Sequence, residues 1–241
     1  MQGFIDLHSH YVVGIDDGVK SHAESRALLE GLARAGFSRV VATPHMRPGM
    51  FDNLKADLER AYAHTLEGLG EPAGLPELAL ASEHYFDDVV FERLLGGDAL
   101  PYPGGRAVLV ELPPRGFPAR LPQRLLDLKR RGLVPVIAHP ERYEPVWKDA
   151  EVLEALLDVG AVLQLDVAAL EGKYGRAPRK AAEQLLEEGY YHLASSDAHK
   201  PTDVDAVRRG IDRLFERAGD EEARFLLIEG PLELLEPRAP S

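Results

Sequence analysis

Short apolar runs alternate with longer amphipathic segments along nearly the whole chain of 241 residues. Each run has four to six residues, is almost entirely apolar and is bounded by glycine, proline or polar residues. This pattern is typical of parallel strands that are buried on both faces. Seven runs are therefore predicted to be strands: 3–7, 39–43, 78–82, 107–112, 133–138, 161–165 and 192–195.

Helical periodicity fills the segments between these runs. The first helix is predicted to begin at a capping box formed by Ser21 and Glu24 and to end at Gly36. Further helices are expected over 53–69, 87–95, 118–131, 149–159, 176–188 and 202–218, and near 220–228. Strands that alternate with helices predict an α/β fold, either a βα barrel or a doubly wound sheet. Without a linker or repeat, we expect one domain over 1–241 with a short loose tail at 236–241.

Composition narrows the class of protein. No apolar stretch reaches the roughly 18 residues of a membrane span, and the N-terminus lacks the features of a signal peptide, so we expect a cytoplasmic protein without direct membrane insertion. The net charge of -12 argues against a non-specific nucleic-acid binder. The sequence contains no cysteine, which excludes disulfides, thiolate metal ligands and a cysteine nucleophile.

Histidines and carboxylates follow the predicted strands at their carboxyl ends. The chain has nine histidines, and five of them lie at four of these strand ends. In a βα barrel these ends meet in one mouth, where active sites are built. The residues that this arrangement would bring together are His8, His10, Asp17, His45, Glu83, Glu111, His139, Asp197 and His199.

So many carboxylates in one mouth would repel one another and carry raised pKa values unless cations were bound. The sequence therefore predicts a polynuclear metal site. Imidazole and carboxylate ligands without sulfur fit manganese, iron or zinc, and nine ligands suit two or three ions rather than one. Such clusters activate water and hold both the attacking and the leaving oxygen during displacement at phosphorus.

Each residue taken alone has a simpler interpretation. A single histidine after a strand is more often a hydrogen-bonded loop residue, Glu111 could form an ion pair, and Asp197 could cap a helix. The other four histidines are expected to be structural or exposed, with His84 a candidate for a supporting position because it follows Glu83: His22, His64, His84 and His192.

Several motifs resemble those of the PHP (polymerase and histidinol phosphatase) superfamily. These motifs are HSH after the first strand, PH after the second, HPERY at 139–143 and SSDAH at 195–199. The similarity narrows to the bacterial CpsB/YwqE-type protein-tyrosine phosphatases through GIDDG at 14–18, TPHMRPGMF at 43–51, and GKYGRAPRKAAEQLLEEG ahead of SSDAHK. Together the motifs cover the chain from residue 3 to about residue 200.

The resemblance implies a distorted, TIM-like (β/α)7 barrel of the PHP type and a manganese-dependent trinuclear centre. It implies one ligand group for each ion: His8, His10 and Asp197; Glu83, Glu111 and His139; and Asp17, His45 and His199. Glu83 would also bridge the first two ions. Asp16 remains the alternative to Asp17 in the third group.

The resemblance also assigns residues that would contact the substrate. Arg142, in HPERY, would bind the phosphate oxygens, although a salt bridge with Glu141 or a neighbour is the simpler interpretation. Arg47 would help to hold the phosphorylated segment, or would be a solvated loop residue. Asp166 stands where related sequences tend to carry a small neutral polar residue, so it would alter the supporting hydrogen bonds or join the centre directly.

The predicted reaction is hydrolysis of phosphotyrosine in a protein by metal-activated water. His199, if protonated, would assist the departing phenol, whose pKa of about 10 makes it a good leaving group. The expected substrate is the tail of a bacterial tyrosine kinase that controls capsule or exopolysaccharide synthesis. The rivals are another PHP phosphoesterase, acting on a small phosphate such as histidinol phosphate or on a nucleotide phosphodiester, and a metal-stabilised binding module. The native metal and the oligomeric state stay open.

Overall fold

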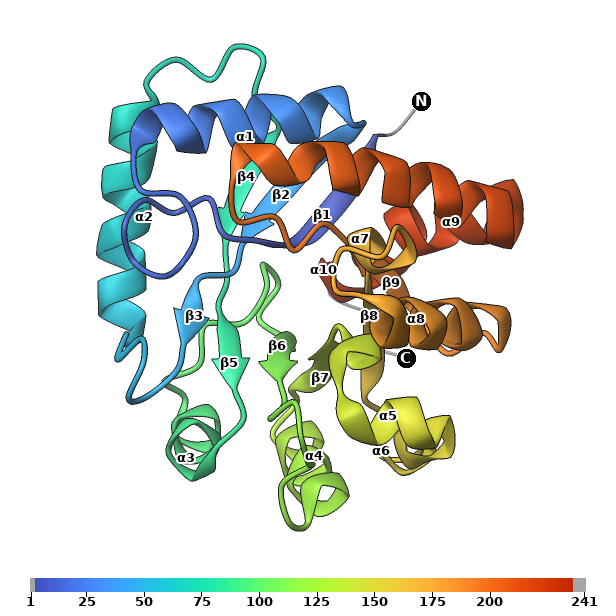
Figure 1. Ribbon diagram of the computed structural model, residues 1–241. Helices are drawn as coiled ribbons and strands as arrows, with labels where there is room; N and C mark the ends of the chain where they lie inside the picture. The colour runs from blue at the N-terminus through green and yellow to red at the C-terminus, as the bar shows by residue number, and fades with distance from the viewer. Residues whose placement is uncertain (1–2, 236–241) are drawn as a thin grey trace.

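Parallel strands form the centre of the molecule, and helices lie outside them (Figure 1). The computed structural model describes residues 3–235. One sheet has the order β1-β2-β4, and the other has the order β3-β5-β6-β7-β8-β9. The strands are β1 (Phe4–Ser9), β2 (Phe37–Ala42), β3 (His45–Met46), β4 (Glu77–Leu80), β5 (Glu83–Tyr85), β6 (Ala107–Glu111), β7 (Val134–Ala138), β8 (Val162–Asp166) and β9 (Leu193–Ser195).

The two sheets join into a barrel. On one side, β2 continues into β3 and β4 continues into β5 after interruptions of two residues each, at 43–44 and 81–82. On the other side, β9 and β1 meet through a parallel bridge between Ser9 and Ala198 and a 2.9 Å hydrogen bond from Asp197 N to His8 O. The seven predicted strands are thus found within two residues of their expected ends, and they form a barrel rather than an open doubly wound sheet.

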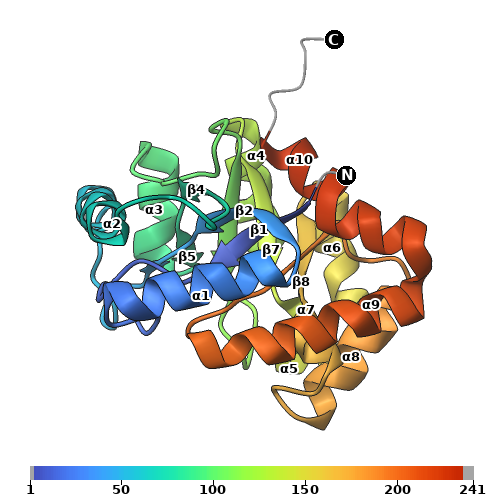
Figure 2. The same cartoon turned by 90° about the horizontal axis from the view of Figure 1, so that it is seen from above.

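The helices follow the strands in the expected alternation, and α1 and α9 lie side by side outside the strands in both views (Figure 1 and Figure 2). None of the helices within residues 3–235 is long and apolar enough to cross a membrane. The helices are α1 (His22–Arg34), α2 (Lys55–Leu69), α3 (Asp88–Gly96), α4 (Leu121–Arg130), α5 (Glu144–Lys148), α6 (Glu154–Asp158), α7 (Val167–Leu170), α8 (Arg176–Glu187), α9 (Val204–Arg224) and α10 (Gly230–Leu235).

The helix boundaries show where the sequence pattern was informative. Ser21 caps α1 by accepting a hydrogen bond from Glu24 N (3.2 Å), as predicted. The break expected between 218 and 220 is present as a non-helical Gly219 within α9, and a π-helical turn, η4 (Phe225–Glu229), follows. The pattern did not predict α5, α7 or α10, which are short. The tail predicted at 236–241 lies outside the described residues.

Alternating strand positions build two apolar layers. Ile5 and Leu7 of β1 and Leu109 of β6 face a cluster inside the barrel, whereas neighbouring positions face the surrounding helices. Leu234 and Leu235 of α10 belong to the inner cluster, and they cover the barrel at the amino ends of the strands. The polar side chains therefore gather at the opposite, carboxyl end.

A close backbone approach between α9 and α7 gives a test of this packing. A Cβ atom added at Gly210 would lie 2.2 Å from the carbonyl oxygen of Val167, and neither backbone can yield without moving a helix. We predict that Gly210→Ala lowers the free energy of unfolding by about 1–3 kcal/mol in urea titrations. Gly96→Ala in α3, where the added atom meets nothing within 4 Å, should be neutral or slightly stabilising. Equal losses in both variants would contradict this description of the interface.

Candidate active site

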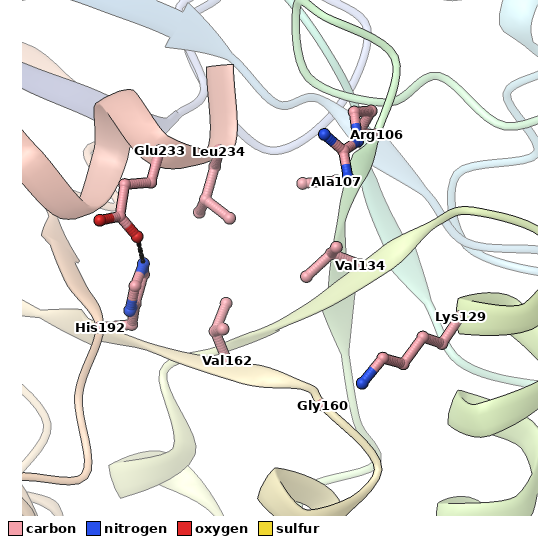
Figure 3. Close-up of a pocket in the computed structure, with 9 residues that line it drawn as sticks. All are labelled: Arg106, Ala107, Lys129, Val134, Gly160, Val162, His192, Glu233 and Leu234. Carbon is pink, nitrogen blue, oxygen red and sulfur yellow. Dashed lines mark ion pairs between the residues drawn. The ribbon is translucent and has the colours of Figure 1, made fainter. Parts of the chain in front are cut away.

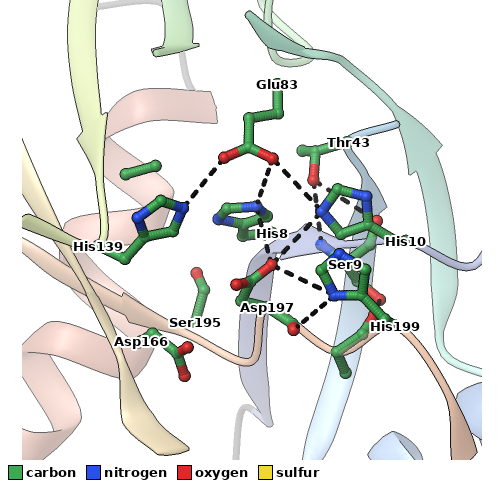
Figure 4. Close-up of polar contacts among 12 residues, drawn as sticks. His8, Ser9, His10, Thr43, Glu83, His139, Asp166, Ser195, Asp197 and His199 are labelled. Carbon is green, nitrogen blue, oxygen red and sulfur yellow. Dashed lines mark hydrogen bonds and ion pairs between the residues drawn. The ribbon is translucent and has the colours of Figure 1, made fainter. Parts of the chain in front are cut away.

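The carboxylate of Glu83, at the start of β5, is surrounded by four imidazoles, two from the strands β1 and β3 and two from the residues that follow β1 and β7. Figure 4 shows three of them, His8, His10 and His139. Its Oε2 lies 3.2 Å from His8 Nε2 and 3.5 Å from His10 Nε2. The same oxygen lies 3.0 Å from His45 Nδ1, and Oε1 lies 3.1 Å from His139 Nε2. Glu83 is only 1% exposed, so its charge depends on these neighbours rather than on water.

The two carboxylate oxygens of Asp197, in the loop after β9, have different partners. Oδ1 lies 3.1 Å from His8 Nε2 and 3.4 Å from His10 Nε2. It also lies 3.6 Å from His199 Nδ1. Oδ2 instead accepts a hydrogen bond from Nη1 of Arg142. One carboxylate therefore connects the imidazole cluster to the arginine.

The two acids of the GIDDG turn have different roles. Asp17 is about half exposed, and its Oδ1 lies 3.4 Å from His45 Nε2 and 3.5 Å from His199 Nε2. Asp16 is buried, and its Oδ2 accepts hydrogen bonds from His10 Nδ1 (2.8 Å) and His45 N (3.1 Å). Asp16 therefore orients the ring of His10, and Asp17 faces the open mouth. Sequence spacing could not separate these two roles.

All nine residues predicted to converge are brought together. Their donor atoms fall into four groups, each within 4.8 Å: His10, Asp17, His45 and His199; His8, His10 and Asp197; His8, Glu83 and His139; and His45, Glu83 and Glu111. Asp166 belongs to none of these groups; its carboxylate instead accepts a hydrogen bond from Ala168 N (2.9 Å), at the start of α7.

The donor set fits divalent cations. Several buried atoms of the cluster have no hydrogen-bond partner within residues 3–235: His8 Nε2, His10 Nε2, His45 Nδ1, Glu111 Oε2 and His139 Nδ1. Buried polar atoms are normally paired, because an unpaired one costs free energy. Imidazole nitrogens and carboxylate oxygens without sulfur suit manganese, iron or zinc.

Protons balance the carboxylates of this cluster when no cation does. Burial opposes a charge on His8, but the carboxylates of Asp197 and Glu83 outweigh it and raise the pKa of His8 to about 10. Burial also opposes charges on His45 and His199, and neighbouring carboxylates again prevail and raise both pKa values to about 9. A cation that binds these imidazoles therefore displaces protons.

The pKa values of two other members of the cluster are shifted in the direction that favours the neutral form of each group. Burial, together with the nearby Glu83, raises the pKa of Glu111 to about 7. Burial and the adjacent Arg142 guanidinium lower the pKa of His139 to about 4, so that this imidazole is neutral at physiological pH. Neutral imidazole is the form that coordinates metal ions.

Arg142 lies beside the cluster, in the single turn η1 (Pro140–Arg142) after β7. Its guanidinium is bonded to Asp197, lies 3.8 Å from Asp166 Oδ2, and stacks over the ring of Tyr174 at 4.4 Å. The simpler alternative, a salt bridge with Glu141 or a neighbour, is present in its second form, because Arg142 pairs with Asp197. Glu141 instead accepts hydrogen bonds from other groups, including Asp166 N (3.0 Å). Arg142 is thus held at the edge of the cluster.

A cleft of about 160 Å³ opens onto the cluster. Arg47 lines it, with its guanidinium 4.0 Å above the Tyr85 ring and 3.8 Å from Glu111 Oε2. The apolar lining comes only from Met50 and Phe51. The complete lining is Asp17, His45, Arg47, Met50, Phe51, Glu83, Glu111, His139, Arg142, Asp197 and His199.

The remaining histidines lie outside the cluster. His84 is buried, donates from Nδ1 to Leu109 O (2.9 Å) and accepts from Leu100 N at Nε2 (3.3 Å). Burial lowers its pKa to about 4, which fits the neutral form that these two bonds require. His22 and His64 pack against each other. These three histidines therefore have structural contacts, as expected, and His84 does not support the cluster through its hydrogen bonds.

A second cavity lies at the other end of the barrel, by the amino ends of β6, β7 and β8 (Figure 3). At about 230 Å³ it is larger than the cleft over the cluster. Its ionisable side chains are spread around the rim, and the only ion pair drawn among its lining residues joins His192 to Glu233 at 3.3 Å. The convergent chemistry is therefore at the carboxyl end, where barrel enzymes place their active sites.

A parallel βα barrel with clustered histidines and carboxylates at its carboxyl end defines a metal-binding barrel of the hydrolase type. The family model for capsular polysaccharide synthesis CpsB/CapC matches residues 4–236, and the chain belongs to that family.

Relatives extend this finding. The chain is 27% identical over 237 residues to the tyrosine-protein phosphatase CpsB of Streptococcus pneumoniae, covering 96% of this chain and 98% of that one. It is 29% identical over 240 residues to the putative tyrosine-protein phosphatase CapC of Staphylococcus aureus, covering 97% and 92%. The chain also superposes on a crystal structure with a TM-score of 0.86 and 27% identity, over 96% of this chain and 94% of that one. That structure comes from work on YwqE of Bacillus subtilis and CpsB of Streptococcus pneumoniae, which are described as metal-dependent tyrosine phosphatases.

The raised histidine pKa values predict how the metal-free protein responds to pH. Imidazolium–carboxylate pairs stabilise the fold fully below the ordinary histidine pKa of about 6.5, and this stabilisation is lost as the pH rises through 9 to 10. In chelator, the free energy of unfolding should therefore fall between about pH 6.5 and pH 10, by up to about 1.4 kcal/mol per pH unit for each imidazole. Urea titrations at several pH values measure this slope.

Variants separate this effect from the titration of lysines and tyrosines. His199→Asn should flatten the slope, whereas His22→Asn, outside the cluster, should leave it unchanged. The same slope in all three proteins would show that the cluster does not hold these protons.

Proposed function

We propose that this chain is a manganese-dependent protein-tyrosine phosphatase. The observation that carries the proposal is the cluster around Glu83, in which nine imidazole and carboxylate residues meet in one mouth. Membership of the CpsB/CapC family and the names of the relatives support phosphotyrosine as the substrate group. The sequence has no cysteine, so a thiol-based phosphatase mechanism is excluded.

We assign one ligand group to each of three ions: His8, His10 and Asp197; Glu83, Glu111 and His139; and Asp17, His45 and His199. The first and third sets each lie within a group of donor atoms that are within 4.8 Å of one another, whereas Glu111 and His139 share such groups with Glu83 but not with each other. In this assignment the two oxygens of Glu83 face different imidazoles, as a bridging carboxylate requires. Asp17 is preferred to Asp16 because the Oδ2 atom of Asp16 is already bonded to His10 Nδ1.

Divalent cations bound at these ligands supply Lewis-acid activation of water and of the phosphoryl oxygens. The chain itself supplies the remaining contacts. Asp197 holds one nitrogen of Arg142, and the other guanidinium N–H groups can donate to phosphate oxygens. Arg47 extends the positive surface along the cleft, and Met50 and Phe51 provide its apolar wall for an aromatic ring. His199 is the most exposed imidazole of the cluster, and it would assist the departing phenol as an acid only while it carries a proton and no cation.

The proposed physiological substrate is the phosphotyrosine-containing tail of a bacterial tyrosine kinase that controls capsule or exopolysaccharide synthesis. The family description, capsular polysaccharide synthesis, supports this choice of process. The proposal includes the cytoplasmic location expected from the sequence.

Metal-stripped protein tests the proposed activity. Added Mn²⁺ should restore hydrolysis of a phosphotyrosine peptide, and a chelator should abolish it. The kcat/KM for the peptide should exceed that for histidinol phosphate by at least about tenfold, equivalent to about 1.4 kcal/mol of discrimination. A preference for histidinol phosphate would overturn the substrate assignment. No hydrolysis of either compound with Mn²⁺, Fe²⁺ or Zn²⁺ would overturn the enzymatic function.

Arg142 gives a second test, directed at phosphate binding. Arg142→Ala should lower kcat/KM for the peptide by roughly 10²–10³-fold, since an oriented charged donor to the transition state is lost. Arg142→Lys should recover only part of this loss, because an ammonium cannot form the two-pronged contact. Arg115→Ala is the matched control, since Arg115 is 89% exposed and pairs only loosely with Glu144 (3.7 Å).

Bound manganese must be measured in each variant, because Arg142 also contacts Asp197. Full metal content with unchanged kcat/KM in Arg142→Ala would remove Arg142 from the substrate site.

A further inference from the structure

Neither β8 nor the segment that follows it supplies a donor to any of the four metal-binding groups, although the segments after its neighbours β7 and β9 supply His139, Asp197 and His199. Two polar residues nevertheless interrupt its apolar pattern, Gln164 and Asp166, at alternate positions on one face. Gln164 is 1% exposed. A buried amide in an apolar strand needs hydrogen-bond partners, so the contacts of Gln164 indicate why it is there.

Both ends of the Gln164 amide are bonded. Oε1 lies 2.8 Å from His8 Nδ1, and Nε2 donates to Ser195 Oγ at 3.0 Å. Ser195 Oγ is itself anchored, because it also accepts a hydrogen bond from Leu7 N (3.2 Å). The amide is thus fixed between β1 and β9, with its oxygen towards the histidine.

This orientation determines the protonation of His8. An amide oxygen can only accept, so the proton must reside on Nδ1 of His8. The other nitrogen, Nε2, then points towards Glu83 Oε2 (3.2 Å) and Asp197 Oδ1 (3.1 Å), with no hydrogen-bond partner of its own. If the Gln164 amide were rotated by 180°, its NH₂ group would face His8 Nδ1, and the neutral ring would carry its proton on Nε2. That proton would prevent Nε2 from coordinating a cation.

We propose that Gln164 is a positioning residue for the metal centre, which keeps the His8 proton on Nδ1 and directs Nε2 to the cation. The inference rests on the proposed metal-dependent function. His10 has the same arrangement with a different acceptor, since its Nδ1 faces the carboxylate of Asp16 (2.8 Å). His199 Nδ1 faces the backbone carbonyl of Asp197 (3.1 Å).

A neutral acceptor suits His8 in particular. Two carboxylates already flank its Nε2. The amide of Gln164 orients the ring without adding negative charge.

The test measures Mn²⁺ binding by metal-stripped protein, from the signal of free Mn²⁺ in electron paramagnetic resonance. Gln164→Leu has a similar volume but no acceptor, and it should weaken binding of at least one ion by 10–100-fold, the usual effect of removing such a partner. Gln164→Glu keeps an acceptor in either protonation state and should restore most of the affinity at pH 8. Gln184→Leu, on the exposed face of α8, is the control and should bind as the unaltered protein does.

A spectroscopic measurement keeps the proposal testable if Gln164→Leu folds poorly. In Zn²⁺-loaded protein, the His8 Nδ1–H proton should resonate downfield and exchange slowly with water because it is hydrogen-bonded to Gln164 Oε1, and Gln164→Asn, whose side chain is one methylene shorter, should lose both features. Unchanged Mn²⁺ affinity in Gln164→Leu would overturn the proposal, as would equal weakening in Gln164→Leu and Gln164→Glu. Failure of the unaltered protein to bind Mn²⁺ or hydrolyse phosphotyrosine would instead overturn the proposed function.

Discussion

The buried charge of Glu83 is the interaction on which the site depends. A carboxylate with 1% exposure is stable only if positive or polarised groups replace water around it. Four imidazoles do so, and they come from β1, β3 and the loop after β7, so the charge ties distant parts of the chain together. Breaking one of these contacts leaves both partners buried, and the cluster therefore behaves as a unit.

The residues that close the barrel are partly the same residues that form this cluster. The hydrogen bonds that join β9 to β1 are made by the donor residues themselves, from Asp197 N to His8 O and from His10 N to Ala198 O, each 2.9 Å long. Asp197 (φ 43°) and His139 (φ 34°) also adopt left-handed backbone conformations that side chains disfavour. Such conformations persist when surrounding contacts impose them, and they cluster at functional sites.

The sequence pattern predicted the strands and the convergence of the nine residues because both follow from short-range regularities. Buried parallel strands are apolar throughout, and their carboxyl ends must meet. The interruptions that separate β3 and β5 from the strands before them were not predictable, since a two-residue break leaves no signal in hydropathy. The roles of Asp16 and Gln164 depend on side-chain directions across the barrel, which spacing alone does not fix. The polar Gln164 within an apolar run was the one available clue.

The cluster also explains how an acidic protein can hold a phosphate. The net charge of the chain is -12, but salt screens exposed charges beyond about 8 Å, so the charge close to the cleft determines whether a phosphate is attracted. Without cations, protons on His8, His45 and His199 offset the carboxylates. Each proton replaced by a divalent cation adds one positive charge beside Arg142. Binding of cations at the cluster therefore strengthens the attraction of a phosphate to the cleft, so the two binding events are coupled.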